Sequence, residues 1–152
     1  MANMTDQAFV NKLLQAFFTA SATTTFTPGT GGGSAFIVTP PFHLRLMTAT
    51  GTNTSNGTEA TAGGCPGYVA LGSSFGSSAF GTPSGGQQTN NNAVNWSATG
   101  TWATITGIEV WDTAATPIRY LQGALTSNIT GVSNGDTVSF AVGSVTVNSS
   151  AW

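Results

Sequence analysis

The stretch "TWATITGIEVWDTA", residues 101–114, decides the fold of this chain. It is rich in β-branched and aromatic residues, which pack well on the half-buried surface of a sheet. Gly107 interrupts the run, and an isolated glycine inside a strand pattern indicates a β-bulge. We therefore predict a bulged strand here, within a domain built mainly from strands.

Further strand candidates lie on both sides of this stretch. In residues 42–50, Leu44 and Leu46 share one face of a strand, whereas His43, Arg45 and Met47 share the other. The remaining predicted strands are residues 34–40, 68–72, 117–126 and 136–148.

Glycines and polar residues separate these strands. In the last strand the alternation of apolar residues shifts at Gly143, which indicates a second bulge, and "SNGD" at 133–136 predicts a turn before it. Residues 51–67 and 84–92 are predicted to be polar loops. Short strands with turns between them predict an antiparallel β-sandwich or jelly-roll-like domain over residues 35–152.

The N-terminal segment has a different pattern. Its apolar residues recur at the spacing of one helix face, which predicts an amphipathic helix within residues 1–26 and a glycine-rich linker at 27–34. A helix of this length must dock its apolar face, either on the chain's own sheet or on a neighbouring subunit. The candidate assembly interface is therefore Phe9, Val10, Leu13, Leu14, Phe17 and Phe18.

The chain is unusually poor in charge. Only 5% of its 152 residues are Asp, Glu, Lys or Arg, against about 25% in typical soluble domains. Three basic residues, Lys12, Arg45 and Arg119, cannot form a cationic surface for phosphates, which excludes nucleic-acid binding of that kind. A surface of hydroxyls and amides suits either a subunit packed in an assembly or a sugar-binding protein.

The sequence shows no pattern that is typical of a targeting signal. No apolar run is long enough to cross a membrane, and the first residues lack the regions of a secretory signal. We therefore expect no membrane association, and synthesis and folding in a cytoplasm.

One motif of the chain matches a catalytic pattern. Residues 72–76 match the G-x-S-x-G spacing of a nucleophile elbow, but the single histidine, His43, lies upstream of Ser74 and no helix pattern follows. We therefore expect no hydrolase, and no enzyme of another class. The acidic residues Glu59, Glu109, Asp112 and Asp136 stand singly, so neither a metal site nor a cofactor is expected.

Tryptophans offer one other binding hypothesis. Sugar rings stack on aromatic faces, so Trp96 and Trp152 are candidate contacts for a glycan. The alternative is that tryptophans in or near strands fill the core.

Four pieces of sequence carry a family resemblance. They are "NKLL" at 11–14, "NNNAVNWSATGTWATITGIEVWDTA" at 90–114, "RYLQGALT" at 119–126 and "VSNGDTVSFAVGSVTV" at 132–147. In this order they resemble a family of small virion proteins of tailed phages, usually described as tail-fibre or minor tail proteins and similar to capsid decoration proteins. The resemblance implies no catalytic residue.

Two virion roles follow from this resemblance. The first expectation is a capsid decoration protein on the capsid surface, bound to the major capsid protein and to copies of itself, with a trimer as the first guess. The alternative is a tail-fibre or minor tail protein, with host-glycan contact as an option.

Overall fold

The computed structural model describes residues 11, 14, 15, 24–26, 36–38, 42–70 and 80–148. Asn11, Leu14 and Gln15 are helical, and the regular structure of the other described residues is β. The strands are β1 (Thr24–Phe26), β2 (Phe36–Val38), β3 (His43–Ala49), β4 (Thr58–Glu59), β5 (Gln87–Thr89), β6 (Val94–Ser97), β7 (Ile105–Trp111), β8 (Arg119–Ile129), β9 (Thr137–Phe140) and β10 (Thr146–Asn148).

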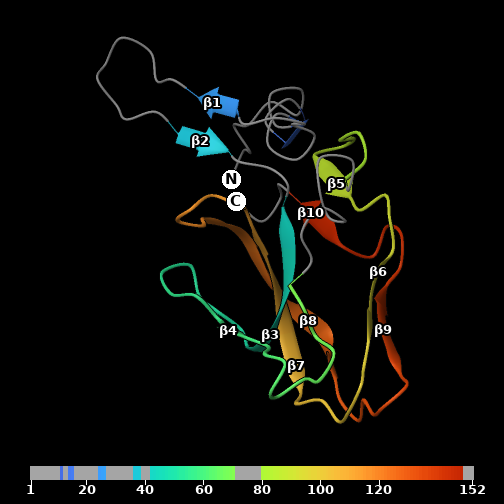
Figure 1. Ribbon diagram of the computed structural model, residues 1–152. Helices are drawn as coiled ribbons and strands as arrows, with labels where there is room; N and C mark the ends of the chain where they lie inside the picture. Colours follow the sequence, from blue (N-terminus) through green and yellow to red (C-terminus); the bar gives the residue numbers. More distant parts are fainter. Residues whose placement is uncertain are drawn as a thin grey trace.

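Every strand pairing is antiparallel (Figure 1). The largest sheet has four strands in the order β4-β3-β7-β8, and three two-stranded pairs accompany it: β1-β2, β5-β10 and β6-β9. The prediction of a mainly β, antiparallel fold is confirmed. The small pairs do not form one continuous second sheet, so the sandwich or jelly-roll arrangement stays a prediction.

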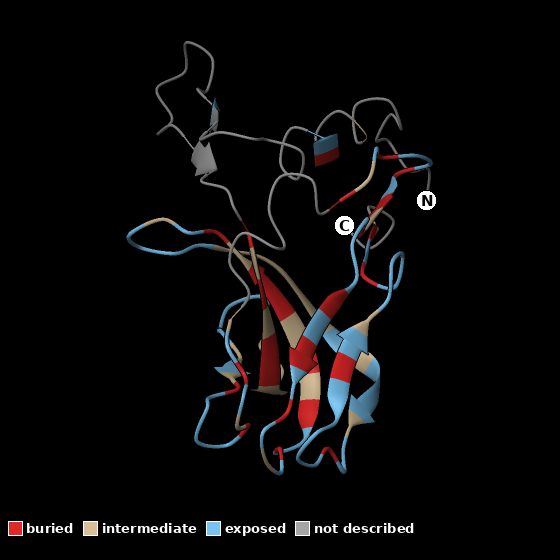
Figure 2. Ribbon diagram, turned by 45° about the vertical axis from the view of Figure 1, so that its right-hand side comes forward, coloured by how far each residue is buried: buried red, intermediate tan, exposed pale blue. Residues whose placement is uncertain are grey.

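The hydrophobic core joins the four-stranded sheet to β6, β9 and β10. Leu44, Leu46 and Val110 belong to the same buried cluster as Trp96 of β6 and Val138 of β9. Buried positions alternate with exposed ones along these strands, as Figure 2 shows, because successive side chains point to opposite faces. The strand predicted at 101–114 is confirmed as β7, which contributes buried residues at the centre of the large sheet.

An irregularity lies beside Gly107, as predicted, but its extra residues belong to β8 and not to β7: the two steps from Ile105 to Gly107 face five steps of β8, from Ala124 to Ile129. The register between β7 and β8 shifts between Ile105 and Gly107. A Cβ atom at Gly107 would lie 2.8 Å from the carbonyl oxygen of Gly123 and 2.8 Å from the hydroxyl of Thr50. A side chain at Gly107 would therefore push these two strands or the Thr50 loop apart.

The prediction for residues 136–148 is wrong in one respect. The chain does not continue through Gly143 as one bulged strand: β9 pairs with β6, and β10 pairs with β5. Gly143 lies in a turn with φ +78°, which favours glycine. Because this turn redirects the backbone, the shift in alternation marks a change of strand partner.

Two other local predictions need correction. Tyr68–Ala70 is not a strand: the Tyr68 N–H donates to the carbonyl of Cys65 in a turn, at 2.9 Å. The loop predicted at 84–92 contains the strand β5, which pairs with β10. The turn predicted at 133–136 is confirmed, because the Asp136 N–H donates to the Ser133 carbonyl across it, at 3.1 Å.

The N-terminal predictions fall largely outside the described residues. Of the six candidate interface residues, Leu14 is described, whereas Phe9, Val10, Leu13, Phe17 and Phe18 lie outside that part of the chain. The glycine-rich linker predicted at 27–34 also lies outside the described residues. Within the described residues, no helix has the length and apolar character to span a membrane.

Candidate assembly surface

Most described charges lie around one face of the four-stranded sheet. On β3 and β7, the register places Arg45 opposite Glu109 and His43 opposite Trp111, all on the face away from Leu44 and Leu46. The Arg45 guanidinium lies 4.7 Å from the centroid of the Trp111 ring, a cation–π geometry. This face is called the charged face below.

The first ion pair of this face joins Arg45 to Glu59 of β4. The Arg45 Nη1 to Glu59 Oε2 distance is 2.9 Å, and 21% and 30% of the two side chains are exposed. The Tyr68 hydroxyl donates to the other carboxylate oxygen of Glu59 at 2.9 Å. Burial, chiefly, raises the pKa of the Tyr68 hydroxyl, which therefore stays a donor at ordinary pH.

The second ion pair is buried. Arg119 Nη1 lies 2.9 Å from Glu109 Oε1, and the Glu109 side chain is 0% exposed. The same carboxylate accepts the Gly57 N–H at 2.8 Å and the Trp111 indole N–H at 2.9 Å. A buried carboxylate with three donors is well satisfied, so it serves structure here.

The loop at residues 51–57 covers this buried pair. Arg119 donates to the carbonyls of Thr52 and Ser55, and the Gln122 side chain donates to the Asn53 side chain at 3.0 Å. Gly57 fits only as glycine, because a Cβ atom would lie 2.6 Å from the Ala49 carbonyl oxygen. Arg119, Gln122 and Glu109 therefore attach the 51–57 loop to the sheet.

The remaining described carboxylates also have partners. The Tyr120 hydroxyl donates to Asp112 at 3.1 Å, and the Ile118 N–H donates to it at 2.8 Å. Asp136 accepts the Ser133 N–H at 2.8 Å. Burial is the main cause that lowers the pKa of His43, followed by the charge of Arg45.

Catalytic and metal-binding arrangements were compared with this geometry. No group of three or more His, Cys, Asp or Glu side chains that could hold a metal ion occurs among the described residues. Ser74, with the rest of residues 71–79, lies outside the described residues.

Of the two tryptophans predicted to contact a glycan, the structure describes one. Trp96 is 3% exposed; its ring packs against Tyr68 and Phe140, and its N–H donates to the Val69 carbonyl at 2.8 Å. Such a ring fills the core and has no face left for a sugar. Trp152 lies outside the described residues.

Leu14, from the predicted helix interface, is likewise a core residue. It is 0% exposed and belongs to the same cluster as Phe42 and Phe80. Asn11 accepts the Gly86 N–H at 3.0 Å. The predicted helix could dock on the chain's own sheet or on a neighbouring subunit. The burial of Leu14 in this cluster favours the chain's own domain for that residue.

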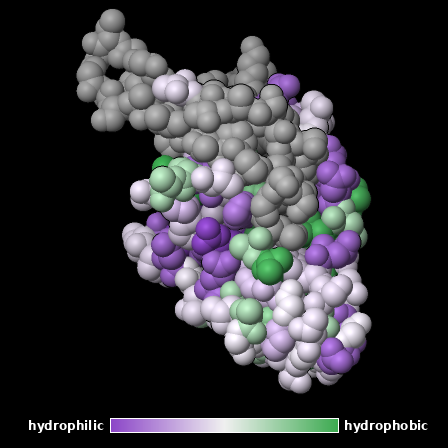
Figure 3. Space-filling model, viewed as in Figure 1, coloured by the Kyte–Doolittle hydropathy of each residue, from purple (hydrophilic) through white to green (hydrophobic). Residues whose placement is uncertain are grey.

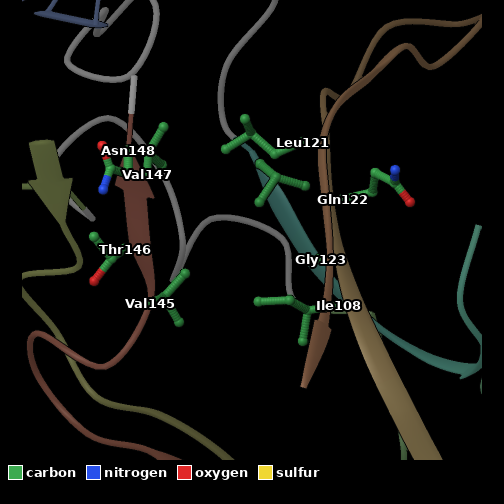
Figure 4. Close-up of a pocket in the computed structure, with 9 residues that line it drawn as sticks. Ile108, Leu121, Gln122, Gly123, Val145, Thr146, Val147 and Asn148 are labelled. Atoms are coloured by element: carbon green, nitrogen blue, oxygen red, sulfur yellow. The ribbon is translucent and has the colours of Figure 1, made fainter. Parts of the chain in front are cut away.

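An apolar groove lies on the opposite side of the large sheet from the charged face. Its volume is about 240 Å³, and side chains of β7, β8 and β10 face one another across it, while Gln122 points away (Figure 4). The lining residues are Ile108, Val110, Leu121, Gln122, Gly123, Val145, Thr146, Val147 and Asn148.

The surface outside these features is largely neutral. Figure 3 shows one face of the molecule as mostly pale, with hydrophilic patches and a few hydrophobic spots. The large apolar side chains that are exposed among the described residues are Val69, Ile118 and Val142. A surface of this kind makes contacts through hydroxyls, amides and backbone, which salt weakens little because few ion pairs are involved.

Sequence reasoning identified β7 and β8 as strands but missed the buried Glu109–Arg119 pair that they form. The two residues are ten positions apart on adjacent strands, and the β7–β8 register with its irregularity near Trp111 brings them together. One signal was present: a glutamate and an arginine each stand inside strands that are otherwise almost free of charge. A charge in such a setting is expected to be paired.

Comparisons with known proteins add a family assignment to this geometry. A search among curated proteins finds no match. A family described as "Podophage GP4 fiber I protein gp80" matches residues 3–148, a range that includes all ten of the described strands and the two ion pairs above. The resemblance to tailed-phage virion proteins is thereby confirmed, and the chain belongs to this family of phage fibre proteins.

Proposed function

We propose that this protein is a structural subunit of the tail fibre of a short-tailed phage. The match to a fibre family over residues 3–148 carries the proposal. It favours the tail-fibre alternative over capsid decoration, because the family description names a fibre and no capsid.

The charged groups support a structural role. In the described part of the chain, every Asp and Glu side chain accepts a hydrogen bond from an arginine, a tyrosine, an indole or a backbone N–H. Groups held in this way stabilise a fold and are poorly placed to exchange protons with a substrate. The protein acts by binding other virion subunits, including copies of itself, and not by catalysis.

Copy number in the virion tests the proposal. Purified particles would be analysed by quantitative mass spectrometry, with the major capsid protein as the internal reference and a known tail protein as the control. A tail fibre has a small copy number that tracks the tail protein. A number in fixed proportion to the capsid subunits would instead establish capsid decoration, and absence from particles would refute both roles.

Antibody labelling separates location from stoichiometry. Gold-labelled antibodies against the folded domain should bind at the tail end of intact particles in electron micrographs. Labelling spread over the capsid would contradict the fibre proposal even if the copy number were small.

A further inference from the structure

Two Asn–Gly pairs occur in this chain, Asn56–Gly57 and Asn134–Gly135. This dipeptide is especially prone to spontaneous deamidation, because glycine has no side chain to hinder attack by its backbone nitrogen. Asn56 lies in the loop between β3 and β4 (Figure 1), Asn134 lies in the turn before β9, and both are exposed to water. The sequence alone therefore indicates two sites of similar reactivity.

Deamidation at such a pair forms one bond and breaks another. The glycine N–H loses its proton, and its nitrogen attacks the side-chain carbonyl carbon of the asparagine. The side-chain nitrogen leaves as ammonia and takes that proton with it, so that a cyclic succinimide remains. Water then opens the ring at either carbonyl, which gives aspartate or isoaspartate. The reaction needs a backbone N–H that can be deprotonated and a peptide that can turn toward the side chain.

The Gly57 N–H meets neither requirement. It donates to Glu109 Oε1 at 2.8 Å, and the Glu109 side chain is 0% exposed. A carboxylate oxygen against this N–H disfavours loss of its proton, because the negative charge that would form on the nitrogen is repelled. The peptide is also closely packed, since a Cβ atom at Gly57 would lie 2.6 Å from the Ala49 carbonyl oxygen and 2.9 Å from the Gly51 nitrogen.

Gly135 has a different environment. Its N–H donates to the Ala98 carbonyl at 2.9 Å, so the acceptor is neutral. A Cβ atom at Gly135 would have no neighbour within 4 Å, so the surroundings leave this peptide room to turn. Hydrogen bonds to charged acceptors are stronger than hydrogen bonds between neutral groups. The two Asn–Gly pairs therefore differ in protection, although they share the same dipeptide.

We propose that Asn56 is a latent deamidation site, which the buried Glu109–Arg119 pair keeps unreactive. Arg119 holds the carboxylate at 2.9 Å and also donates to two carbonyls of the 51–57 loop, so it fixes the acceptor and the loop together. While the pair is intact, Asn56 is protected more strongly than Asn134. Loss of the pair releases the glycine N–H and with it the reaction.

The reaction also prevents the loop from attaching again. The succinimide nitrogen carries no hydrogen, so Glu109 loses one of its three donors. Isoaspartate adds a carbon atom to the backbone and aspartate adds a second carboxylate close to Glu109, and both changes oppose the original contact. The inference goes beyond the proposed function, because it concerns the chemical lifetime of the folded subunit in any part of the virion.

Ageing of the purified full chain at mildly alkaline pH tests the proposal. Cleavage at Arg45 and Arg119 places Asn56 and Asn134 on different peptides, so mass spectrometry follows the two sites separately. Synthetic peptides that contain each pair give the rates without structure. Asn56 is expected to react about tenfold to a hundredfold more slowly in the folded chain than in its peptide, as for loss of a hydrogen bond to a charged group. The reduction should be smaller for Asn134.

Two variants separate the ion pair from general stability. Glu109→Gln removes the charge against the Gly57 N–H, and it is expected to raise the rate at Asn56 about tenfold without changing the rate at Asn134. Asn90→Ala is the matched control, because it removes three hydrogen bonds elsewhere and leaves the ion pair intact. It should leave the rate at Asn56 unchanged. Circular dichroism establishes that both variants fold.

Three results would overturn the proposal. The first is that Asn56 reacts as fast in the folded wild type as in its peptide, or is protected less than Asn134. The second is that Glu109→Gln leaves the rate at Asn56 unchanged. The third is that Asn90→Ala raises this rate as much as Glu109→Gln, which would assign the protection to global stability. The first comparison needs no variant, so it decides the matter even if Glu109→Gln does not fold.

Discussion

The two ion pairs of the charged face differ in exposed fraction and not in nitrogen–oxygen distance. Their contributions to the free energy of unfolding should therefore differ. Both nitrogen–oxygen distances are 2.9 Å, but the Glu109 side chain is 0% exposed and the Glu59 side chain 30%. We consider Glu109→Gln and Glu59→Gln, which keep the shape of each side chain and remove its charge. The comparison isolates the effect of burial on the ion pair.

Glu109→Gln leaves the Arg119 guanidinium buried without a counter-charge. The side chain of Arg119 is 12% exposed, and breaking a buried pair in this way costs about 3 to 5 kcal/mol. Gln keeps one acceptor oxygen for the Gly57 N–H, so the lower end, about 3 kcal/mol, is expected. Glu59→Gln should cost at most about 1 kcal/mol, as for partly exposed pairs in general.

Urea unfolding monitored by tryptophan fluorescence measures both values. Trp111 donates to Glu109 and reports directly on this region. In a thermal scan, the loss of about 3 kcal/mol corresponds to a fall in Tm of about 6 to 12 °C for a chain of this size. Equal losses in the two variants, or a loss below about 1 kcal/mol for Glu109→Gln, would refute the reasoning that burial sets the strength of the pair.

Three further predictions concern the sheet, the amides and pH. Gly107→Ala should lower the free energy of unfolding by about 1 to 3 kcal/mol, because its Cβ atom would lie 2.8 Å from a backbone carbonyl oxygen. Gly123→Ala, where the space is open, should change the free energy of unfolding by less than about 0.5 kcal/mol. Urea titrations compare the two variants. Asn90→Ala should cost about 2 to 4 kcal/mol in the same assay, because Asn90 is buried and three backbone groups lose their partner; a loss under 1 kcal/mol would contradict it. The pKa of His43 is lowered in the folded chain, so the unfolded chain binds more protons, and the free energy of unfolding falls as pH drops through the ordinary range of histidine. His43→Gln should flatten this part of the curve of stability against pH. An unchanged slope would show that other groups cause the pH dependence.

The large sheet could be predicted from the sequence because its strands carry a clear pattern. Leu44 and Leu46 alternate with polar residues, and both are buried in β3 as predicted. Gly107 stands alone in a run of β-branched residues, and it does mark an irregular register. These features depend on neighbours along one strand, which the sequence contains directly.

The features that were missed depend on contacts between distant segments. Gln88 and Asn90 lie in a stretch whose amides indicate a solvated loop, yet both are 1% exposed. Asn90 donates to the carbonyls of Asn92 and Ala141 and accepts the Val145 N–H, so it connects the start of β6 with the turn between β9 and β10. No local pattern distinguishes an amide that replaces backbone hydrogen bonds in this way from one that faces water.

The low charge of the chain has a structural consequence that composition did not show. The composition predicts a surface with few charges. The structure adds that Glu109 and Arg119 form a buried ion pair, which attaches the 51–57 loop to the sheet. This leaves the groove and the outer edge of β8 free of unpaired charge. Pairing Glu109 with Arg119 inside the fold therefore keeps two of the chain's few charges away from its surface.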